Sequence, residues 1–198
     1  GQHFKLKGET YRFVGANMWY AAYLGADTAF GDRERLHKEL DDLKALGVTN
    51  LRILASSELS PPKNSLDPAF RTKEHGNYNA ELLTGLDYLL VELAKRDMKG
   101  VLYLTNFWEW SGGMMAHLDY VTGQYINNGD PAHPWPAFAK HAAQFYSNEQ
   151  ALALYHDYVR FLVSRTNSLT GKAYADDPTI MAWQLSNEPR QGGDEDDS

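Results

Sequence analysis

Apolar and polar residues alternate at the start of the chain and then give way to longer periodic segments. The alternation around Gly8 predicts a β-hairpin of residues 4–6 and 11–13, which leads into a more buried strand over residues 14–17. Further along, short apolar runs typical of buried strands take turns with segments whose apolar residues recur every three or four positions, as in helices. The pattern therefore predicts a hairpin followed by alternating strands and helices.

The predicted helices share an amphipathic pattern and have recognisable ends. Asp32 is a candidate N-cap and Gly47 a candidate C-cap for the first helix, and Ser147 or Asn148 is the candidate N-cap of the last. The helices are predicted over residues 32–47, 79–98 and 148–167, and the later strands over residues 48–54, 99–106 and 178–185. The order is then a hairpin followed by strand and helix four times over, with the last helix missing.

The connections between these elements are unequal in length. Those that follow strands, at residues 55–76 and 109–145, are long and have the composition of loops, whereas those that precede strands are mostly short. Strand–helix alternation implies a parallel sheet with right-handed crossovers. Long segments after the strands match a (β/α)8 TIM barrel, whose active site lies at the carboxyl ends of the strands. The expected fold class is therefore α/β, a TIM barrel of which this chain supplies an N-terminal hairpin and roughly the first four βα units.

A doubly wound open sheet is the alternative fold. Such a sheet usually has a glycine-rich phosphate-binding turn after its first strand, and residues 15–25 are aromatic there instead. The TIM barrel is therefore the favoured architecture.

The composition of the chain argues against several classes of binding partner. Hydrophobic residues make up 43% of the 198 positions, which fits a folded domain. A net charge of −7 without a basic stripe disfavours nucleic acid, and no apolar stretch approaches the roughly 20 residues of a membrane helix. The chain has no cysteine, no metal-binding histidine spacing and no phosphate-binding loop. We therefore expect no nucleic acid, no membrane span, no metal and no cofactor.

Polar residues that could carry chemistry lie within or just after two of the predicted strands. Glu188 comes directly after the strand at residues 178–185, beside Asn187, and Pro189 should hold Glu188 in an extended conformation. Arg52 lies between Leu51 and Ile53, so its side chain points to the opposite face of the strand, which in a barrel is the interior. A solvated loop carboxylate and a structural ion pair are the alternative interpretations of Glu188 and Arg52.

Aromatic residues are unusually frequent and gather after the predicted strands. They make up 13% of the chain, with 5 Trp and 12 Tyr. Trp19 follows the first strand, and Asn106 and Trp108 end the third, so all three should face one mouth of the barrel. Indole rings stack on the C–H faces of sugars, and such clefts hold polysaccharides. Hydrophobic packing that pins long loops is the alternative, above all for Trp135 between its prolines.

Four separated stretches together resemble one enzyme family. "RFVGANMWY", "LGVTNLRIL", "YLTNFWEWSGGM" and "WQLSNEPR" resemble glycoside hydrolase family 5, specifically its endo-β-1,4-mannanases. The short "NEP" motif is weak alone, but it gains weight from "LRI" at the second strand and "N-x-W-x-x-x-GG" after the third. The resemblance covers nearly the whole chain, in order and with suitable spacing.

The resemblance implies a retaining glycosidase with defined roles for these residues. Glu188 would be the general acid/base, Asn187 would bind the sugar 2-hydroxyl, and Arg52 would orient the nucleophilic carboxylate. Trp19, Asn106 and Trp108 would bind substrate. The substrate would be a β-mannan polysaccharide or manno-oligosaccharides, and a polymeric substrate implies a secreted protein. Hydrolysis of β-1,4-glucans by the same family and a non-catalytic carbohydrate-binding half-barrel are the alternatives.

The resemblance also implies parts that this chain lacks. A retaining enzyme needs two carboxyls about 5 to 5.5 Å apart, and the second belongs after strand seven of a barrel of roughly 250 residues. We therefore expect residues 1–198 to be the N-terminal half of one catalytic domain, completed by a second polypeptide fragment. Residues 191–198, "QGGDEDDS", have the composition of an acidic flexible loop or a cleavage site.

Overall fold

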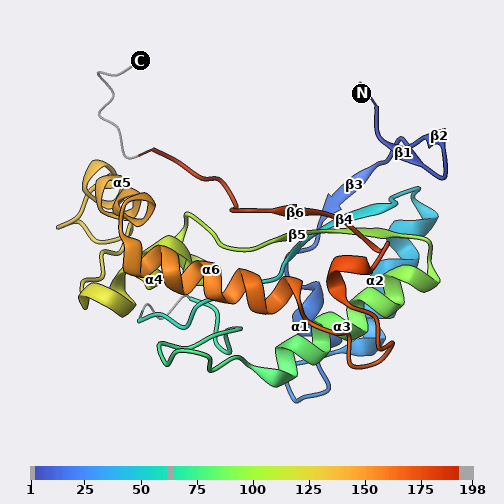
Figure 1. The fold of residues 1–198 in the computed structure, drawn as a ribbon, viewed down its shortest axis with the longest axis horizontal. Coiled ribbons are helices and arrows are strands. Elements are labelled where there is room, and N and C mark those ends of the chain that lie inside the picture. Colours follow the sequence, from blue (N-terminus) through green and yellow to red (C-terminus); the bar gives the residue numbers. More distant parts are fainter. Residues whose placement is uncertain (1–2, 62–64, 192–198) are drawn as a thin grey trace.

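A four-stranded parallel sheet lies at the centre of the computed structural model, which describes residues 3–61 and 65–191 (Figure 1). Its strands stand side by side in the order in which they occur along the chain. They are β3 (Gly15–Asn17), β4 (Asn50–Leu54), β5 (Lys99–Tyr103) and β6 (Ile180–Gln184). Each strand pairs in parallel with the next, so the predicted strand order and direction are confirmed. The predicted residues 191–198 fall outside the described residues except for position 191.

The N-terminal hairpin is shorter than the apolar alternation predicts. It pairs β1 (Lys5–Leu6) with β2 (Glu9–Thr10), so its second arm comes earlier than residues 11–13. The turn consists of Lys7 and Gly8, both at positive φ, 52° and 89°. A two-residue turn of this kind matches the twist of paired strands and fixes their register, which is why pairing begins immediately beside it.

Six α-helices connect the strands or lie between them in the described part of the chain. They are α1 (Ala21–Gly25), α2 (Arg33–Ala45), α3 (Ala80–Lys95), α4 (Gly113–Thr122), α5 (Trp135–Ala143) and α6 (Glu149–Val163). The Asp32 carboxylate accepts the Arg35 amide at 2.9 Å, which confirms it as the N-cap of α2. Asn148 accepts the Ala151 amide at 3.0 Å, so Asn148 caps α6.

The prediction of one long loop over residues 109–145 was wrong. This segment contains α4 and α5 together with the 3₁₀ turns η1 (Glu109–Ser111) and η2 (Gln144–Tyr146). Gly112, Gly113 and the prolines around Trp135 gave the segment the composition of a loop, although α4 buries Met114 and Met115 completely. Tertiary packing therefore outweighs local composition here. Residues 55–76 contain no helix or strand among the described positions, as predicted.

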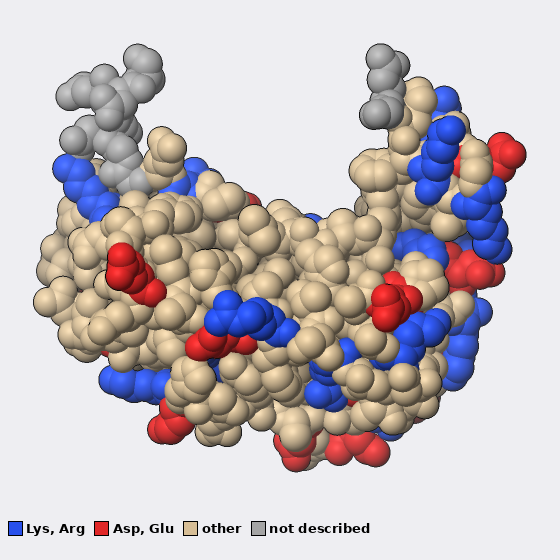
Figure 2. Space-filling view, in the orientation of Figure 1, with Lys and Arg blue, Asp and Glu red and all other residues tan. Residues whose placement is uncertain are grey.

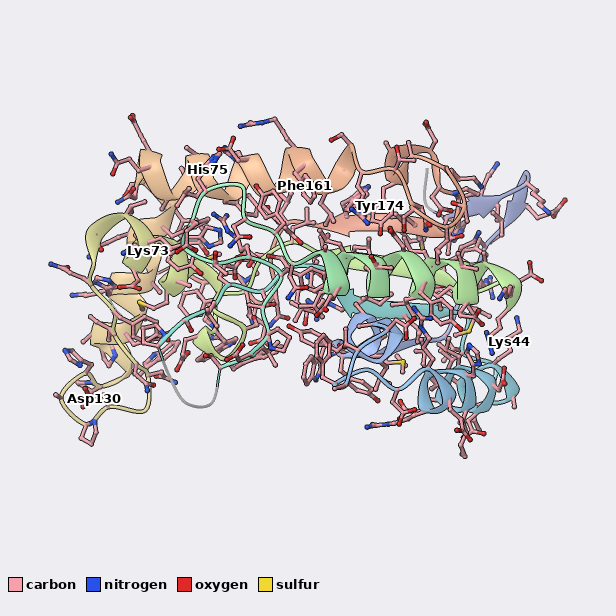
Figure 3. All side chains as sticks on the ribbon, turned by 90° about the horizontal axis from the view of Figure 1, so that it is seen from below. Lys44, Lys73, His75, Asp130, Phe161 and Tyr174 are labelled. Carbon is pink, nitrogen blue, oxygen red and sulfur yellow. The ribbon has the colours of Figure 1, made fainter. Side chains whose placement is uncertain are left out.

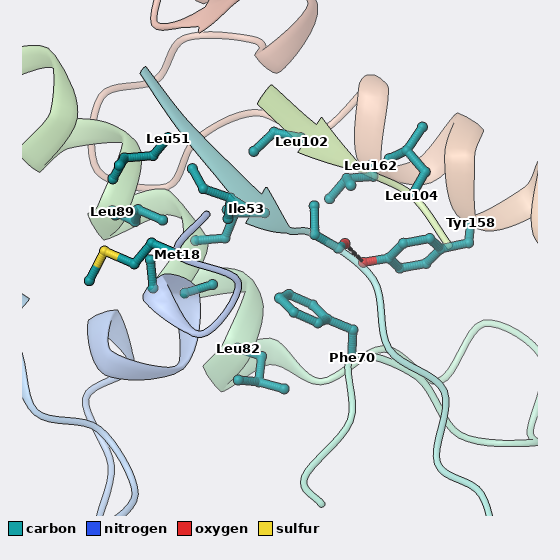
Figure 4. Packing of buried hydrophobic residues seen from close by; sticks show 14 of the residues in the cluster. Met18, Leu51, Ile53, Phe70, Leu82, Leu89, Leu102, Leu104, Tyr158 and Leu162 are labelled. Carbon is teal, nitrogen blue, oxygen red and sulfur yellow. Dashed lines mark hydrogen bonds between the residues drawn. The ribbon is translucent and has the colours of Figure 1, made fainter. Parts of the chain in front are cut away.

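The core lies between the sheet and the helices on its outer side. Leu51 and Ile53 of β4 and Leu102 of β5 are fully buried against leucines of α3 (Figure 4). The Tyr158 hydroxyl of α6 donates to the Ala55 carbonyl at 2.6 Å, which ties α6 to the end of β4 (Figure 4). Each buried aliphatic side chain contributes about 1.5–3 kcal/mol, so this layer fixes the outer face of the sheet.

The opposite face of the sheet is less covered. In Figure 1, α1, α2, α3 and α6 lie on one side of the strands, and β6 runs along the opposite margin. Figure 2 shows a hollowed margin there, with few charged side chains over β6. Val14 and Leu185 keep 60% and 69% of their surface exposed. Helices on a single face argue against a doubly wound sheet, which has helices on both. No helix within the described ranges is long and apolar enough to cross a membrane.

Candidate active site

Arg52 reaches across the sheet and joins three strands. Its Nε donates to Gln184 Oε1 of β6 at 2.7 Å, and its Nη2 donates to Asn187 Oδ1 at 2.8 Å. Its guanidinium also lies 4.2 Å from the ring centroid of Tyr103, at the end of β5. Two directed hydrogen bonds and an aromatic face hold the planar guanidinium in one orientation. The prediction that Arg52 points to the face opposite Leu51 and Ile53 is confirmed.

Asn106 and Asn187 continue the pairing of β5 and β6 beyond the regular strands. They form an isolated parallel bridge, in which the Asn187 amide donates to the Thr105 carbonyl at 2.8 Å and Phe107 donates to the Asn187 carbonyl at 3.0 Å. Asn187 Nδ2 donates to Asn106 Oδ1 at 2.8 Å. The side chain of Asn187 therefore lies between Arg52 and Asn106, with its second Nδ2 hydrogen left for a ligand.

Glu188 stands at the open edge of this group. Trp108 Nε1 donates to Glu188 Oε2 at 2.6 Å, and Arg190 Nη2 lies 3.6 Å from the same oxygen. The carboxylate side chain remains 55% exposed. It is thus held by one hydrogen bond and one longer ion pair, and it remains open to a substrate from solvent.

The backbone of Glu188 corrects the prediction made from Pro189. Its φ is +44°, in the left-handed region, and not extended. A non-glycine residue in this region carries local strain, which persists only where the surroundings determine the conformation. Here the bridge at Asn187 and the indole of Trp108 determine it. The orientation of the Glu188 carboxylate is therefore determined by tertiary contacts more than by Pro189.

These residues line a hollow of about 430 Å³ at the carboxyl ends of the strands. Its lining includes Asn17, Trp19, Arg52, Tyr103, Trp108, Trp110, Asn187 and Glu188. Five of the six predicted site residues line it directly, and the sixth, Asn106, is completely buried behind them. The structure thus brings together all six residues that the sequence singles out. Glu188 is the one carboxylate among the described residues of this lining.

Two polar members of this group carried weaker signals in the sequence. Tyr103 and Gln184 occupy registered positions at the ends of β5 and β6 and both contact Arg52. Burial raises the pKa of Tyr103 to about 12, against the opposing effect of Arg52, so its phenol stays neutral. The one sequence signal for Gln184 was its polar side chain at the end of an otherwise apolar strand. Its role as a partner of Arg52 is seen only in the structure, where Arg52 Nε donates to it.

Aromatic rings form two walls of the hollow. Trp19 and Trp110 meet edge to face, with ring centroids 5.3 Å apart. On the other side Trp108 lies 5.5 Å from Trp135, with their planes inclined by 30°, and the Arg190 guanidinium lies over both rings. Trp135 begins α5 and packs on Phe138 of the same helix and on Phe107, which fits the predicted packing role, but it is also 40% exposed and extends the indole surface beside Trp108.

No group of three or more His, Asp or Glu side chains that could hold a metal ion occurs among the described residues. The chemistry that these side chains can offer is proton transfer by Glu188, hydrogen bonding by Asn187 and Arg52, and stacking by the indoles. An exposed carboxylate between tryptophans suits a ligand with hydroxyl groups and apolar C–H faces.

One family model matches the whole chain, residues 1–198, and it is described as GH family 5 beta-mannosidase-like. Curated relatives include mannan endo-1,4-beta-mannosidase 1 of Solanum lycopersicum, 29% identical over 97% of this chain and 43% of the relative. The protein of the same name in Oryza sativa subsp. japonica is 31% identical over 96% of this chain and 40% of the relative. The chain therefore spans less than half the length of these relatives.

Solved structures of glycoside hydrolase family 5 also superimpose on this chain. A glycoside hydrolase family 5 mannosidase from Rhizomucor miehei superimposes with a TM-score of 0.89 at 36% identity, covering 96% of this chain and 47% of the other. A mutant of that mannosidase was solved in complex with mannosyl-fructose. An endo-1,4-beta-mannanase from the same organism gives a TM-score of 0.74 at 27% identity, again over 96% of this chain and 47% of the other.

Proposed function

Because this chain belongs to the β-mannosidase-like members of glycoside hydrolase family 5, we propose that it carries the acid/base half of an active site that hydrolyses β-1,4-mannosidic bonds. The neighbours establish the fold as a (β/α)8 barrel, and this chain supplies its first four parallel strands. The substrates of the proposed reaction are mannan, glucomannan, galactomannan and their oligosaccharides. A polymeric substrate places such an enzyme outside the cell, so secretion forms part of the same proposal.

The proposal rests chiefly on the position of Glu188. Its carboxylate is fixed by Trp108 Nε1 at 2.6 Å, beside the side chain of Asn187 and at the edge of an aromatic hollow. In a retaining mechanism Glu188 protonates the leaving oxygen and then removes a proton from the attacking water. The remaining Nδ2 hydrogen of Asn187 would bind the sugar 2-hydroxyl. Trp19 and Trp108 would stack on the sugar rings.

The nucleophile of this mechanism is a second carboxylate, which the lining described above does not contain. Arg52 uses Nε and Nη2 for Gln184 and Asn187, which leaves its Nη1 donors to orient that carboxylate. We propose that four further βα units, in the same or in a second polypeptide, complete the barrel and supply it. Support comes from the uncovered face at Val14 and Leu185 and from a second hollow of about 320 Å³ along β3 and β4.

A second candidate activity is removal of mannose from chain ends. It is favoured by the higher similarity to the Rhizomucor miehei mannosidase than to the endo-mannanase of that organism, with TM-scores of 0.89 against 0.74. The two activities use the same acid/base and the same stereochemistry, and they differ in the products that they release.

An assay of the complete polypeptide that contains this chain tests the proposal. It compares β-mannan, galactomannan, manno-oligosaccharides and carboxymethyl cellulose, with products separated by length. Mixed short oligosaccharides from mannan would support the endo-acting mode, and mannose alone would support the second candidate. A preference for cellulose, or binding of mannan without any release of sugar, would contradict the proposed function.

A further inference from the structure

A second carboxylate, Glu58, lies behind the active-site loops and is only 1% exposed. Its Oε1 accepts the Ser56 hydroxyl and its Oε2 accepts the Gly113 amide, each at 2.7 Å. Its own amide donates to the Ser111 carbonyl at 2.9 Å. Glu58 therefore binds both ends of the Ser111–Gly113 turn, which enters α4.

The turn fits too closely between Glu58 and Asn106 to move independently. Gly112 and Gly113 have φ of +86° and +61°, values that favour glycine. A Cβ on Gly112 would stand 2.1 Å from the Glu58 carbonyl oxygen, and one on Gly113 would stand 2.2 Å from the Asn106 carbonyl oxygen. The double glycine thus lets two backbones approach the turn from opposite sides.

A continuous set of hydrogen bonds leads from this turn to the site. Asn106 Nδ2 donates to Ser111 Oγ at 2.9 Å, and the Asn106 carbonyl accepts the Met114 amide at 2.8 Å. Asn106 Oδ1 then accepts Asn187 Nδ2 at 2.8 Å and the Trp108 amide at 3.1 Å. Because Trp108 and Asn187 flank Glu188, any shift of the turn reaches the carboxylate through two routes.

The charges around Glu58 leave it incompletely compensated. Burial raises the pKa of Glu58 to about 7, against the opposing effects of Ser56, Arg71 and the Gly113 amide. Arg71 is also buried, and its Nη1 donates to the Leu154 carbonyl at 2.8 Å, while its Nε has no partner in the described structure. The buried cation of Arg71 favours an ionised Glu58, but it does not outweigh the effect of burial.

His117 of α4 completes the cluster. Its Nδ1 lies 2.8 Å from the Gly113 carbonyl and must donate there, so in the neutral ring Nε2 is an acceptor. That Nε2 stands 3.8 Å from Glu58 Oε1 without a hydrogen bond. Burial and then Arg71 lower the pKa of His117 to about 3, so the ring stays neutral. The charge of Glu58 also reaches the phenols of Tyr23, Tyr120, Tyr155 and Tyr158, whose pKa values are raised by burial first and by Glu58 in addition.

We propose that Glu58 is a positioning residue that fixes the acid/base, Glu188, through the Ser111–Gly113 turn, Asn106, Trp108 and Asn187. The proposal rests on the function proposed above for Glu188. Glu58 touches no part of the hollow at Glu188, so it acts on catalysis only by setting where these groups stand. It contributes more to turnover than to substrate affinity, because proton transfer depends on the exact position of Glu188 more sharply than stacking depends on the exact position of an indole ring.

Three substitutions in the complete polypeptide test this role. Glu58→Leu keeps the size but removes both acceptors, whereas Glu58→Gln keeps one acceptor for Gly113 and gains an N–H that can reach the orphan Nε2 of His117. Glu92→Leu is the matched control, since Glu92 is 3% exposed on α3 and accepts Lys95 and Arg96 there. Measured per folded molecule on mannan, Glu58→Leu should lower kcat by about tenfold or more with KM within about threefold, because a misplacement near 1 Å costs about 10²-fold.

The comparison of variants separates positioning from mere folding. Glu58→Gln should restore kcat to within about threefold of the wild type, and Glu92→Leu should leave kcat unchanged while lowering stability. An unchanged kcat in Glu58→Leu, or an equal loss in Glu92→Leu, would overturn the proposal. If Glu58→Leu fails to fold, Ser111→Ala decides, because it removes the acceptor of Asn106 Nδ2 without touching Glu58. Ser111→Ala should lower kcat in the same direction, and wild-type turnover would overturn the role of the turn.

A readout without substrate keeps this inference separate from the proposed function. In ¹⁵N-labelled protein, the indole N–H of Trp108, identified by its loss in Trp108→Phe, reports its hydrogen bond to Glu188. The resonance should shift in Glu58→Leu and Ser111→Ala and stay in place in Glu92→Leu. A wild-type protein inactive on every mannan would refute the proposed function, while the resonance would still decide the role of Glu58. An unshifted resonance in both variants would overturn it.

Discussion

Asp87 and Glu58 are both buried carboxylates, but one lies among the outer helices and the other behind the site. Asp87 of α3 accepts two hydrogen bonds from Arg165, at 3.0 and 2.6 Å, one from the Tyr174 hydroxyl at 2.6 Å, and two from Ser168, at 3.1 and 2.7 Å. Tyr174 lies close to α3 in the view of Figure 3. The Glu58 carboxylate accepts one hydrogen bond from the Ser56 hydroxyl and one from the Gly113 amide, and Arg71, the cation that acts on it, makes no direct ion pair with it among the described contacts.

The pKa values of the two groups move in opposite directions. Burial alone would raise the pKa of Asp87, but Arg165, Tyr174 and Ser168 together hold it below its ordinary range. At Glu58 burial prevails and raises the pKa to about 7. The hydrogen bonds of Asp87 compensate its buried charge and join α3 to the segment before β6. The contacts of Glu58 compensate its charge less fully, so ionising this carboxylate beside the Ser111–Gly113 turn is costly. The first arrangement serves stability, and we propose that the second serves catalysis.

The largest expected effect separates activity from stability at the site itself. Glu188→Gln in the complete polypeptide should lower turnover on mannan by about 10³-fold or more, because acid catalysis is lost, with little change in unfolding free energy for an exposed side chain. Glu34→Gln, an exposed glutamate in the first turn of α2, is the control. Near-normal turnover of Glu188→Gln in an initial-rate assay would remove Glu188 from the mechanism.

The converse change is expected at the outer network. Asp87→Asn leaves Arg165 without its buried partner, and breaking such a pair costs about 3–5 kcal/mol. Urea denaturation should show this loss, while kcat per folded molecule should match the wild type. A fall in kcat at full folding would show that the two regions are coupled more closely than the contacts indicate.

A smaller loss of activity is expected at Arg52, which connects the strands to the site. Arg52→Lys keeps the charge but cannot donate to both Gln184 and Asn187 in one plane. Loss of a charged hydrogen bond worth about 1.5–3 kcal/mol should lower kcat/KM by about 10- to 100-fold. Kinetics at saturating and limiting mannan would measure this change. Equal activity of the Lys variant would show that position 52 needs only a positive charge.

The smallest expected effect is a difference in how stability depends on pH at Glu58 and at Asp87, and it distinguishes the two carboxylates most directly. Folded Glu58 binds its proton up to about pH 7, while its ordinary pKa is 4.5. Wild type should therefore lose stability relative to Glu58→Gln as the pH rises between these values. Asp87 has a lowered pKa, so the advantage of wild type over Asp87→Asn should persist across that range and fall only below the ordinary pKa of Asp, about 3.9. Urea denaturation at several pH values measures both slopes, and parallel slopes would refute the contrast.

The regular elements could be predicted because their signals are local. Strand β4 and helices α2, α3 and α6 have apolar periodicity and caps such as Asp32 and Asn148, which the structure confirms. The helices α4 and α5 were missed because glycines and prolines interrupt their segment at several positions. Their stability comes from burial of residues such as Phe138, which no local pattern reveals.

The site residues could be predicted for a different reason. In a parallel sheet, residues that end successive strands meet at one edge, so Arg52, Asn106 and Glu188 could be brought together by counting strands. The backbone of Glu188 and the Glu58–His117 cluster could not, because each depends on contacts between distant parts of the chain. Gly112 and Gly113 were visible in the sequence, but their close neighbours, the Glu58 and Asn106 carbonyls, were not.

The central claim is that Glu188 is the acid/base of a β-mannoside hydrolase. The most direct test is Glu188→Ala in the complete polypeptide, assayed on mannan and on a dinitrophenyl β-mannoside, with and without sodium azide. We predict that mannan hydrolysis falls by about 10³-fold, that cleavage of the dinitrophenyl group, which leaves without protonation, falls far less, and that azide restores turnover and yields β-mannosyl azide. Equal losses on both substrates without rescue by azide would contradict the account.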